Sequence, residues 1–166
     1  MARNLLHYIL PCIDVYERHD RQQRTKTKIV SIILADDHKI VRNGIRVLLE
    51  TEAEFRIVGE AGDGLEAVKQ AENSQPDILV VDISMPGLNG VEVIKQVRKC
   101  SPKTKAVVLS MHSAEVYVRE ALEAGALGYV LKESGPEHLV NAIREALAGR
   151  NYLSPPISKR LLEDTG

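Results

Sequence analysis

Five polar side chains in this sequence are of the types that phosphoryl transfer requires: Asp36, Asp37, Asp82, Ser110 and Lys132. In that chemistry a carboxylate acts as nucleophile, while a metal cation, a hydroxyl donor and an ammonium stabilise charge on the phosphate oxygens. Three carboxylates in one site repel one another and raise one another's pKa unless a cation lies between them. An all-oxygen site suits magnesium better than zinc, which prefers His and Cys.

Each of these residues has a plainer interpretation when it is taken alone. Asp82 could be a turn residue or a helix cap, and Asp36 or Asp37 could cap the helix that follows them. Ser110 alone is typical of a turn, and Lys132 alone of a solvated surface. The elements that position the five side chains therefore decide whether they form a site.

The stretch before Asp82 predicts a strand that is buried on both faces. Residues 78–81 are four branched apolar residues, and residues 85–87, Met-Pro-Gly, mark the end of the strand. Asp82 therefore stands at the carboxyl end of a strand, where open α/β sheets bind their ligands.

Strand and helix patterns alternate between residues 29 and 149. Buried-strand patterns cover residues 29–35, 56–61, 78–81, 106–110 and 127–131. Helical stripes cover residues 41–49, 65–72, 91–97, 118–122 and 136–147. Short connections between such elements require right-handed crossovers. We therefore expect an α/β fold, a doubly wound five-stranded parallel sheet of flavodoxin-like order 2-1-3-4-5 with helices on both faces.

This strand order brings the five polar side chains to one edge of the sheet. The first and third strands are neighbours at the switch point, which places Asp36 and Asp37 beside Asp82. Ser110 ends the fourth strand and Lys132 follows the fifth, so both belong to the same edge. We expect one crevice that holds three acids, a hydroxyl and an ammonium.

Length and composition fit one globular domain with extensions. The chain has 166 residues, 44% of them hydrophobic, which is enough for one core and short for two full domains. Cys12 and Cys100 lie in no Cys or His cluster, which argues against a disulfide framework and a zinc site. We expect a cytoplasmic protein, and the sequence shows no pattern of a signal peptide or a membrane anchor.

Charge divides the chain into three parts. Residues 1–28 carry a net charge of +3 without a regular apolar pattern, and we expect a flexible extension there. Residues 29–149 carry −5, so nonspecific adhesion of this globular part to nucleic acid is not expected. Residues 150–166 contain Pro155 and Pro156, and we interpret them as a linker.

Four phrases give residues 29–149 a resemblance to a known family. They are residues 34–38 (LADDH), 80–86 (VVDISMP), 109–112 (LSMH) and 125–132 (GALGYVLK). The whole globular part resembles the receiver domain of bacterial two-component response regulators, in particular the NarL/FixJ class. The resemblance implies that residues 29–149 are the receiver, and that residues 150–166 lead toward a helix-turn-helix DNA-binding domain that is not in this chain.

The resemblance also implies roles for the acids. Asp82 would be the phosphoacceptor. Asp37, Asp82 and the backbone carbonyl of Ser84 would hold magnesium, and Asp36 would act on the metal through bound water.

Four further residues receive roles from the same resemblance. Ser110 would bond an oxygen of the incoming phosphoryl group, and Lys132 would pair with it. Tyr129 would be an aromatic switch whose rotamer follows Ser110. His112 matches a variable position that tunes the access of water to the acyl phosphate, although a lone His is more often a surface residue.

The implied function is a signalling switch. A sensor histidine kinase would supply the phosphoryl group, and phosphorylation would promote a homodimer or release an effector, most simply a transcription regulator. The sequence departs from the family's common Lys-Pro after the fifth strand, since Lys132 precedes Glu133 here. No contact with a membrane is expected, and DNA would be bound only through a domain outside this chain.

Two other functions use similar residue types. An aspartyl-phosphate phosphatase or phosphotransferase of the haloacid dehalogenase type needs its two acids two residues apart, whereas Asp36 and Asp37 are adjacent and diverge on an extended chain. A flavodoxin-type carrier would need phosphate-binding donors after the first strand, where the two acids would repel phosphate. We therefore expect a phosphoacceptor signalling domain rather than an enzyme.

Overall fold

A computed structural model describes residues 27–164 of the chain, so the predicted N-terminal extension lies outside the described residues except for its last two. The elements, in chain order, are β1 (Val30–Ala35), α2 (Lys39–Glu50), β2 (Phe55–Ala61), α3 (Gly64–Ser74), β3 (Ile78–Val81), α4 (Gly90–Cys100), β4 (Lys105–Ser110), α5 (Glu115–Ala124), β5 (Gly128–Leu131), α6 (Pro136–Leu147), β6 (Tyr152–Leu153) and α7 (Pro155–Asp164). No helix in this range is long and apolar enough to cross a bilayer.

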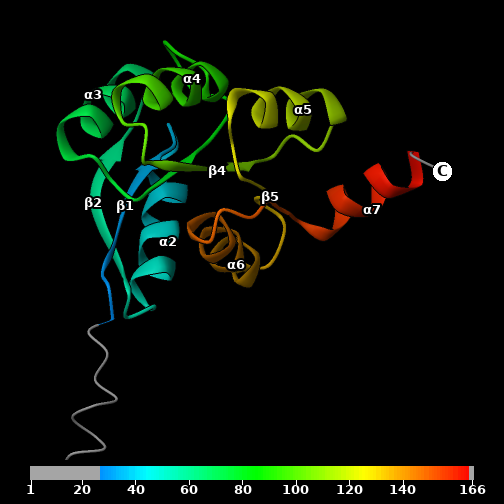
Figure 1. Cartoon of the computed structure of the whole chain (residues 1–166), viewed down its shortest axis with the longest axis horizontal. Helices are drawn as coiled ribbons and strands as arrows, with labels where there is room; N and C mark the ends of the chain where they lie inside the picture. Colours follow the sequence, from blue (N-terminus) through cyan, green and yellow to red (C-terminus); the bar gives the residue numbers. More distant parts are fainter. Residues whose placement is uncertain (1–26, 165–166) are drawn as a thin grey trace, which may run out of the picture.

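The strands form one parallel sheet of order β2-β1-β3-β4-β5-β6, and Figure 1 shows helices above and below it. The predicted order 2-1-3-4-5 is confirmed, and the structure adds the short strand β6 at the outer edge of β5.

Helices cover both faces of the sheet, as predicted. On one face α2 and α6 supply Leu49 and Ile143 to a core that includes Ile32 and Val107. On the other face α3, α4 and α5 pack against the opposite side chains of the same strands. All four residues of β3 are buried because the strand lies inside the sheet and is covered on both sides.

The start of α4 is fixed close to the end of β3. Asn89 caps α4, since its side chain accepts a hydrogen bond from the backbone N–H of Glu92. The N–H of Gly90 donates to the carbonyl oxygen of Ile83 at 2.8 Å. The loop that carries Asp82 and Ser84 is therefore held at both of its ends.

Part of the segment predicted as a linker packs on the sheet. Tyr152 and Leu153 pair with Gly128 and Tyr129 of β5, and α7 follows directly. Ile157 of α7 is only 3% exposed. A two-residue strand is too short to show an alternating pattern in the sequence, which is why β6 was not predicted.

Replacing Gly90 by Ala should lower the free energy of unfolding by about 2–3 kcal/mol, because the new Cβ would lie 2.2 Å from the carbonyl oxygen of Asp82 and 2.8 Å from the Cα of Ile83. Gly44→Ala is the matched control. Gly44 lies inside α2 with no atom within 4 Å of an added Cβ, so this change should raise the free energy of unfolding by about 0.5–1 kcal/mol. Urea unfolding followed by circular dichroism measures both, and a similar effect of the two changes would contradict the close approach.

Candidate functional site

Three acids converge where β1 and β3 end. Ala35 pairs with Val81, and the N–H of Asp82 donates to the carbonyl oxygen of Ala35 at 2.9 Å, so Asp36 and Asp82 leave neighbouring strands side by side. Asp36 is 3% exposed and Asp82 5%, whereas Asp37 is exposed. One candidate ligand atom from each of Asp36, Asp37, His38 and Asp82 lies within 4.8 Å of the others.

The ammonium of Lys132 lies between the two buried acids. Its Nζ is 2.7 Å from Oδ2 of Asp36 and 2.8 Å from Oδ2 of Asp82, and the Lys132 side chain is only 11% exposed. Burial works to lower the pKa of Lys132, but hydrogen bonds and charges from Asp36 and Asp82 outweigh it and hold the pKa above its ordinary value. The lysine is therefore a fixed positive charge at neutral pH.

Lys132 is placed by backbone pairing as well as by charge. Ser110 pairs with Leu131, and the N–H of Lys132 donates to the carbonyl oxygen of Ser110 at 2.8 Å. The ends of β4 and β5 thus lie beside the end of β3, which is the arrangement that the strand order predicted.

The plainer interpretation of Asp82 as a turn residue is compatible with its contacts, whereas the helix-cap interpretation of Asp36 and Asp37 is wrong, because His38 is the N-cap of α2 and no side chain caps that helix. Oδ1 of Asp36 accepts a hydrogen bond from the N–H of His38 at 2.8 Å, at the start of α2. Oδ1 of Asp82 accepts one from the N–H of Ser84 at 3.3 Å. Each acid therefore uses one oxygen to fix its own loop and presents the other to Lys132.

His38 also lies in the cluster, although no role for it was expected from the residue pattern. Its Nδ1 is 3.0 Å from Oδ1 of Asp37 and 3.3 Å from Oδ1 of Asp36. Its position directly after the two acids was visible in the sequence, but the direction of its side chain depends on the turn into α2.

Ser110 and Tyr129 are connected through the loop that follows β4. Both residues are 0% exposed. The N–H of His112 donates to Oγ of Ser110 at 3.1 Å, and the hydroxyl of Tyr129 donates to the carbonyl oxygen of His112 at 2.7 Å. Burial above all raises the pKa of Tyr129 to about 12; the charge of Asp82 adds to this and a hydrogen bond with Ser110 opposes it. Tyr129 thus remains a protonated donor at neutral pH.

The side chain of His112 connects two loops beside Asp82. Its Nε2 lies 2.7 Å from Oγ of Ser84, and its ring stacks on Tyr117 with centroids 4.5 Å apart. The sequence pointed to Ser84 through its backbone carbonyl, and the structure adds a side-chain contact that spacing could not reveal. The loop after β3 is thereby tied to the loop after β4.

The structure gathers all the predicted site residues at one edge of the sheet. Asp36, Asp82 and Lys132 touch directly, with Asp37 beside them. The other four residues, Ser84, Ser110, His112 and Tyr129, form a hydrogen-bonded group. The two groups meet through Asp82 with Ser84 and through Lys132 with Ser110.

The donor set suits a hard cation. The oxygen atoms of Asp36, Asp37 and Asp82 lie close enough to share one ion, and exposed Asp37 gives an approach from solvent. Carboxylate oxygens with room for water are the ligands that magnesium takes in phosphoryl-transfer sites. The acidic cluster thus fits magnesium on its own chemistry.

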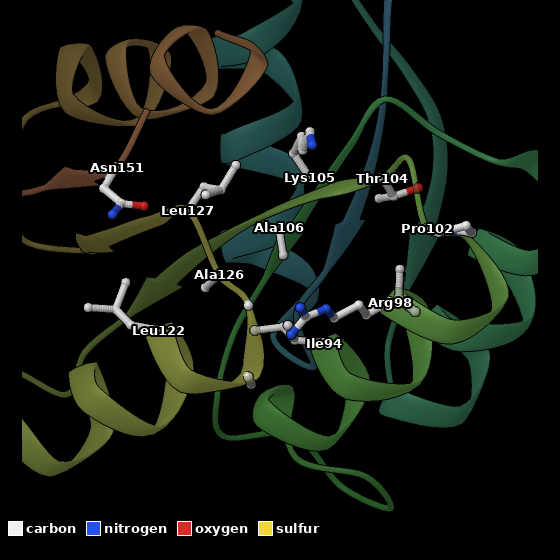
Figure 2. Close-up of a pocket in the computed structure, with 13 residues that line it drawn as sticks. Ile94, Arg98, Pro102, Thr104, Lys105, Ala106, Leu122, Ala126, Leu127 and Asn151 are labelled. Atoms are coloured by element: carbon white, nitrogen blue, oxygen red, sulfur yellow. The ribbon is translucent and has the colours of Figure 1, made fainter. Parts of the chain in front are cut away.

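A separate cavity of about 370 Å³ lies at the opposite ends of the strands, near the start of β4, and is shown in Figure 2. Its lining includes Ile94, Lys105 and Leu122, and Arg98 reaches from α4 toward the loop after α5. None of the predicted site residues lines it, so the cavity and the acidic cluster are independent features.

The family model for the response regulator receiver domain matches residues 32–144. Transcriptional regulatory protein DegU of Brevibacillus brevis is 36% identical over 135 residues, which are 81% of this chain and 57% of DegU. Response regulator GacA of Pseudomonas aeruginosa is 34% identical over 133 residues, 80% of this chain and 62% of GacA. The chain thus spans about three fifths of the length of the curated relatives that it matches.

Solved structures of regulators have the same fold. A two-component response regulator of the LuxR family from Aurantimonas sp. SI85-9A1 matches with a TM-score of 0.80 and 38% identity over 83% of this chain and 99% of that one. The structure of RcsB bound to DNA matches with a TM-score of 0.75 and 31% identity over 82% of this chain and 68% of that one.

Replacing Lys132 by Met should lower the free energy of unfolding by roughly 2–4 kcal/mol at neutral pH, because two buried carboxylates lose their counter-charge. The penalty should shrink in strong base. Because the pKa of Lys132 in the folded state is raised above the ordinary 10.5, its contribution to stability is complete below pH 10.5 and is lost as the pH rises through the folded-state pKa. Urea unfolding at a series of pH values measures the penalty.

Lys95→Met is the control for that series. Lys95 pairs with Glu92 at 3.1 Å, but the Lys95 side chain is 52% exposed, so its loss should cost less than about 0.5 kcal/mol at any pH. Equal penalties in the two variants, or a Lys132 penalty that does not change with pH, would contradict the description of Lys132 as a buried counter-charge.

Proposed function

The chain belongs to the response regulator receiver domain family, and on that premise we propose that Asp82 accepts a phosphoryl group from a phosphohistidine of a sensor histidine kinase. One observation carries the proposal: the ammonium of Lys132 lies within 2.8 Å of a nearly buried Asp82, beside two further acids. The relatives are transcription and response regulators, which favours signalling over a metabolite phosphatase.

This geometry supports the following transfer. A carboxylate oxygen of Asp82 attacks phosphorus, a P–O bond forms, the P–N bond to the imidazole breaks, and the imidazole leaves with the bonding electron pair and takes up a proton. Lys132 then pairs with a phosphoryl oxygen, and the hydroxyl of Ser110 donates to another. Backbone pairing already holds the main chain of both residues at the ends of β4 and β5, so only their side chains turn toward the phosphoryl group during the transfer.

Magnesium would be held by Asp37, Asp82 and the backbone carbonyl of Ser84, with Asp36 acting through bound water. When bound, the metal supplies positive charge that neutralises the phosphoryl oxygens. The close set of carboxylate oxygens supports this assignment. Occupation of the site would also relieve the repulsion among the acids, which Lys132 alone balances only in part.

The phosphoryl group adds a charge of about −2 beside Lys132. Lys132 then turns from Asp36 toward the phosphate, and Ser110 turns toward it from the other side. Because the N–H of His112 donates to Ser110 and Tyr129 donates to the His112 carbonyl, the loop after β4 follows Ser110, and Tyr129 follows the loop. This movement changes the surface of α5 and β5, which then supports a homodimer or releases an effector.

His112 would control the lifetime of the phosphorylated state. Its ring is tied to Ser84 at 2.7 Å and stacks on Tyr117, so it is held against the loop that carries Asp82, where it would limit the approach of water. A smaller side chain at this position would admit water more freely and shorten that lifetime.

The effector would be a DNA-binding domain that follows the receiver and lies outside this chain. Relatives longer than this chain are named as transcriptional regulators, and RcsB was solved bound to DNA. The whole protein would then act in the cytoplasm as a transcription regulator controlled by phosphorylation.

Incubation with acetyl phosphate and magnesium should add the mass of one phosphoryl group to the intact protein. Asp82→Asn should remove this adduct, because an amide is not a nucleophile for phosphorus. Asp63→Asn is the control: Asp63 caps α3, a role that Asn fills equally well, so adduct formation should be unchanged. A comparable adduct in the Asp82 variant would remove Asp82 from the role of phosphoacceptor.

Replacing Asp37 by Asn should weaken the binding of magnesium by about tenfold or more, because one anionic ligand is lost while the fold is kept. Asp37 is exposed, so the fold should tolerate the amide. Titration calorimetry with magnesium chloride on the wild type, Asp37→Asn and Asp63→Asn measures the effect. Equal affinities in all three proteins would show that the metal, if bound, lies elsewhere.

A further inference from the structure

Helix α7 touches the loop that follows β4. Nη1 of Arg160 donates to the backbone carbonyl oxygen of Ser113 at 3.1 Å. Ser113 belongs to residues 111–114, which we call the switch loop, directly after Ser110. Helix α7 therefore contacts the backbone that would respond first to a phosphoryl group on Asp82.

The start of α7 is anchored to β5. The N–H of Ser154 donates to the carbonyl oxygen of Tyr129 at 3.0 Å, and Oγ of Ser154 accepts from the N–H of Leu131 at 3.2 Å. Ser154 is 0% exposed, and Ile157 lies in the same core cluster as Tyr129 and Leu131. The helix extends from this anchor beyond the edge of the sheet (Figure 1).

Two routes thus join the switch loop to α7. In one, Arg160 holds the Ser113 carbonyl directly. In the other, the Tyr129 hydroxyl holds the His112 carbonyl, while the Tyr129 backbone holds Ser154 at the start of α7. Adjacent carbonyls of the switch loop are therefore tied to α7, so the loop cannot shift without straining these contacts or breaking them.

We infer that α7 is clamped to the switch loop in the unphosphorylated protein, and that phosphorylation of Asp82 releases the clamp. The inference rests on the proposed function of Asp82. In the structure Oγ of Ser110 accepts a hydrogen bond from the N–H of His112 in the switch loop. When the Ser110 hydroxyl turns to donate to a phosphoryl oxygen, the switch loop moves with it. A hydrogen bond that is already 3.1 Å long is lost when the Ser113 carbonyl moves by about 1 Å.

The anchor and the clamp differ in what they respond to. Ser154 and Ile157 bind α7 to β5 and the core, and they hold its first turn in either state. Arg160 holds a later turn to a loop that moves. Release therefore frees the end of α7 while its start stays fixed, and a domain joined after Asp164 would be reoriented rather than detached.

Linkage makes the coupling reciprocal. If the clamp favours the unphosphorylated loop, its loss must favour the phosphorylated one by the same factor. Arg160→Ala should therefore speed hydrogen exchange in α7 before phosphorylation and raise the phosphorylated fraction at a limiting concentration of acetyl phosphate, each by about twofold to fivefold. Lys159→Ala, at the neighbouring exposed position of the same helix, should change neither quantity.

Hydrogen exchange followed by mass spectrometry, with intact mass recorded on the same samples, tests the inference. Wild-type and both variant proteins are compared with and without acetyl phosphate and magnesium. Phosphorylation of the wild type should speed hydrogen exchange in residues 158–164. The same faster exchange should be present in the Arg160→Ala variant before phosphorylation, and absent from the unphosphorylated Lys159→Ala variant.

Three results would overturn the inference. An Asp82 adduct that leaves exchange in α7 unchanged would refute the clamp while the proposed function stands. Equal behaviour of the Arg160 and Lys159 variants would show that the Arg160 contact carries no coupling. Absence of any adduct on Asp82 would refute the proposed function, and the inference with it.

Discussion

The ammonium of Lys132 lies within 2.8 Å of both Asp36 and Asp82, two acids that are almost without contact with solvent. Two buried carboxylates that lie close together destabilise a fold unless a positive charge is shared between them. That charge is carried by the residue after β5, which lies two places from β3 and three from β1 in the sheet, so the site exists only when these three strands are assembled in this order. The strand order that completes the fold is therefore the same strand order that assembles the site.

The fold and the cluster of acids were predictable because both follow from periodicity. Apolar runs such as residues 78–81 define strands, parallel strands end at one edge, and the order 2-1-3-4-5 then places Asp36 beside Asp82. Ser110 and Lys132 gained significance only together with the acids, since a lone Ser or Lys after a strand has a plainer meaning, and the resemblance to receivers then implied a specific role for each. That Ser110 and Lys132 lie near the acids follows from the strand order alone.

What the sequence did not reveal depends on loops and side-chain directions. The contact of His112 with Ser84 joins two loops whose paths no apolar pattern encodes. His38 turns toward the acids because of the bend into α2. The anchoring of α7 through Ser154 rests on a buried serine, which in a sequence looks like an ordinary polar linker residue.

Strand β6 has a consequence for the edge of the sheet that it forms. It covers part of the outer side of β5 with only two residues, and the opposite edge strand, β2, has an irregular register against β1 at Ile32 and Ile33. A short edge strand offers few unpaired backbone groups to a strand from another molecule. Extension of the sheet past β6 by a strand from another molecule is therefore disfavoured, which protects this side of the sheet against aggregation.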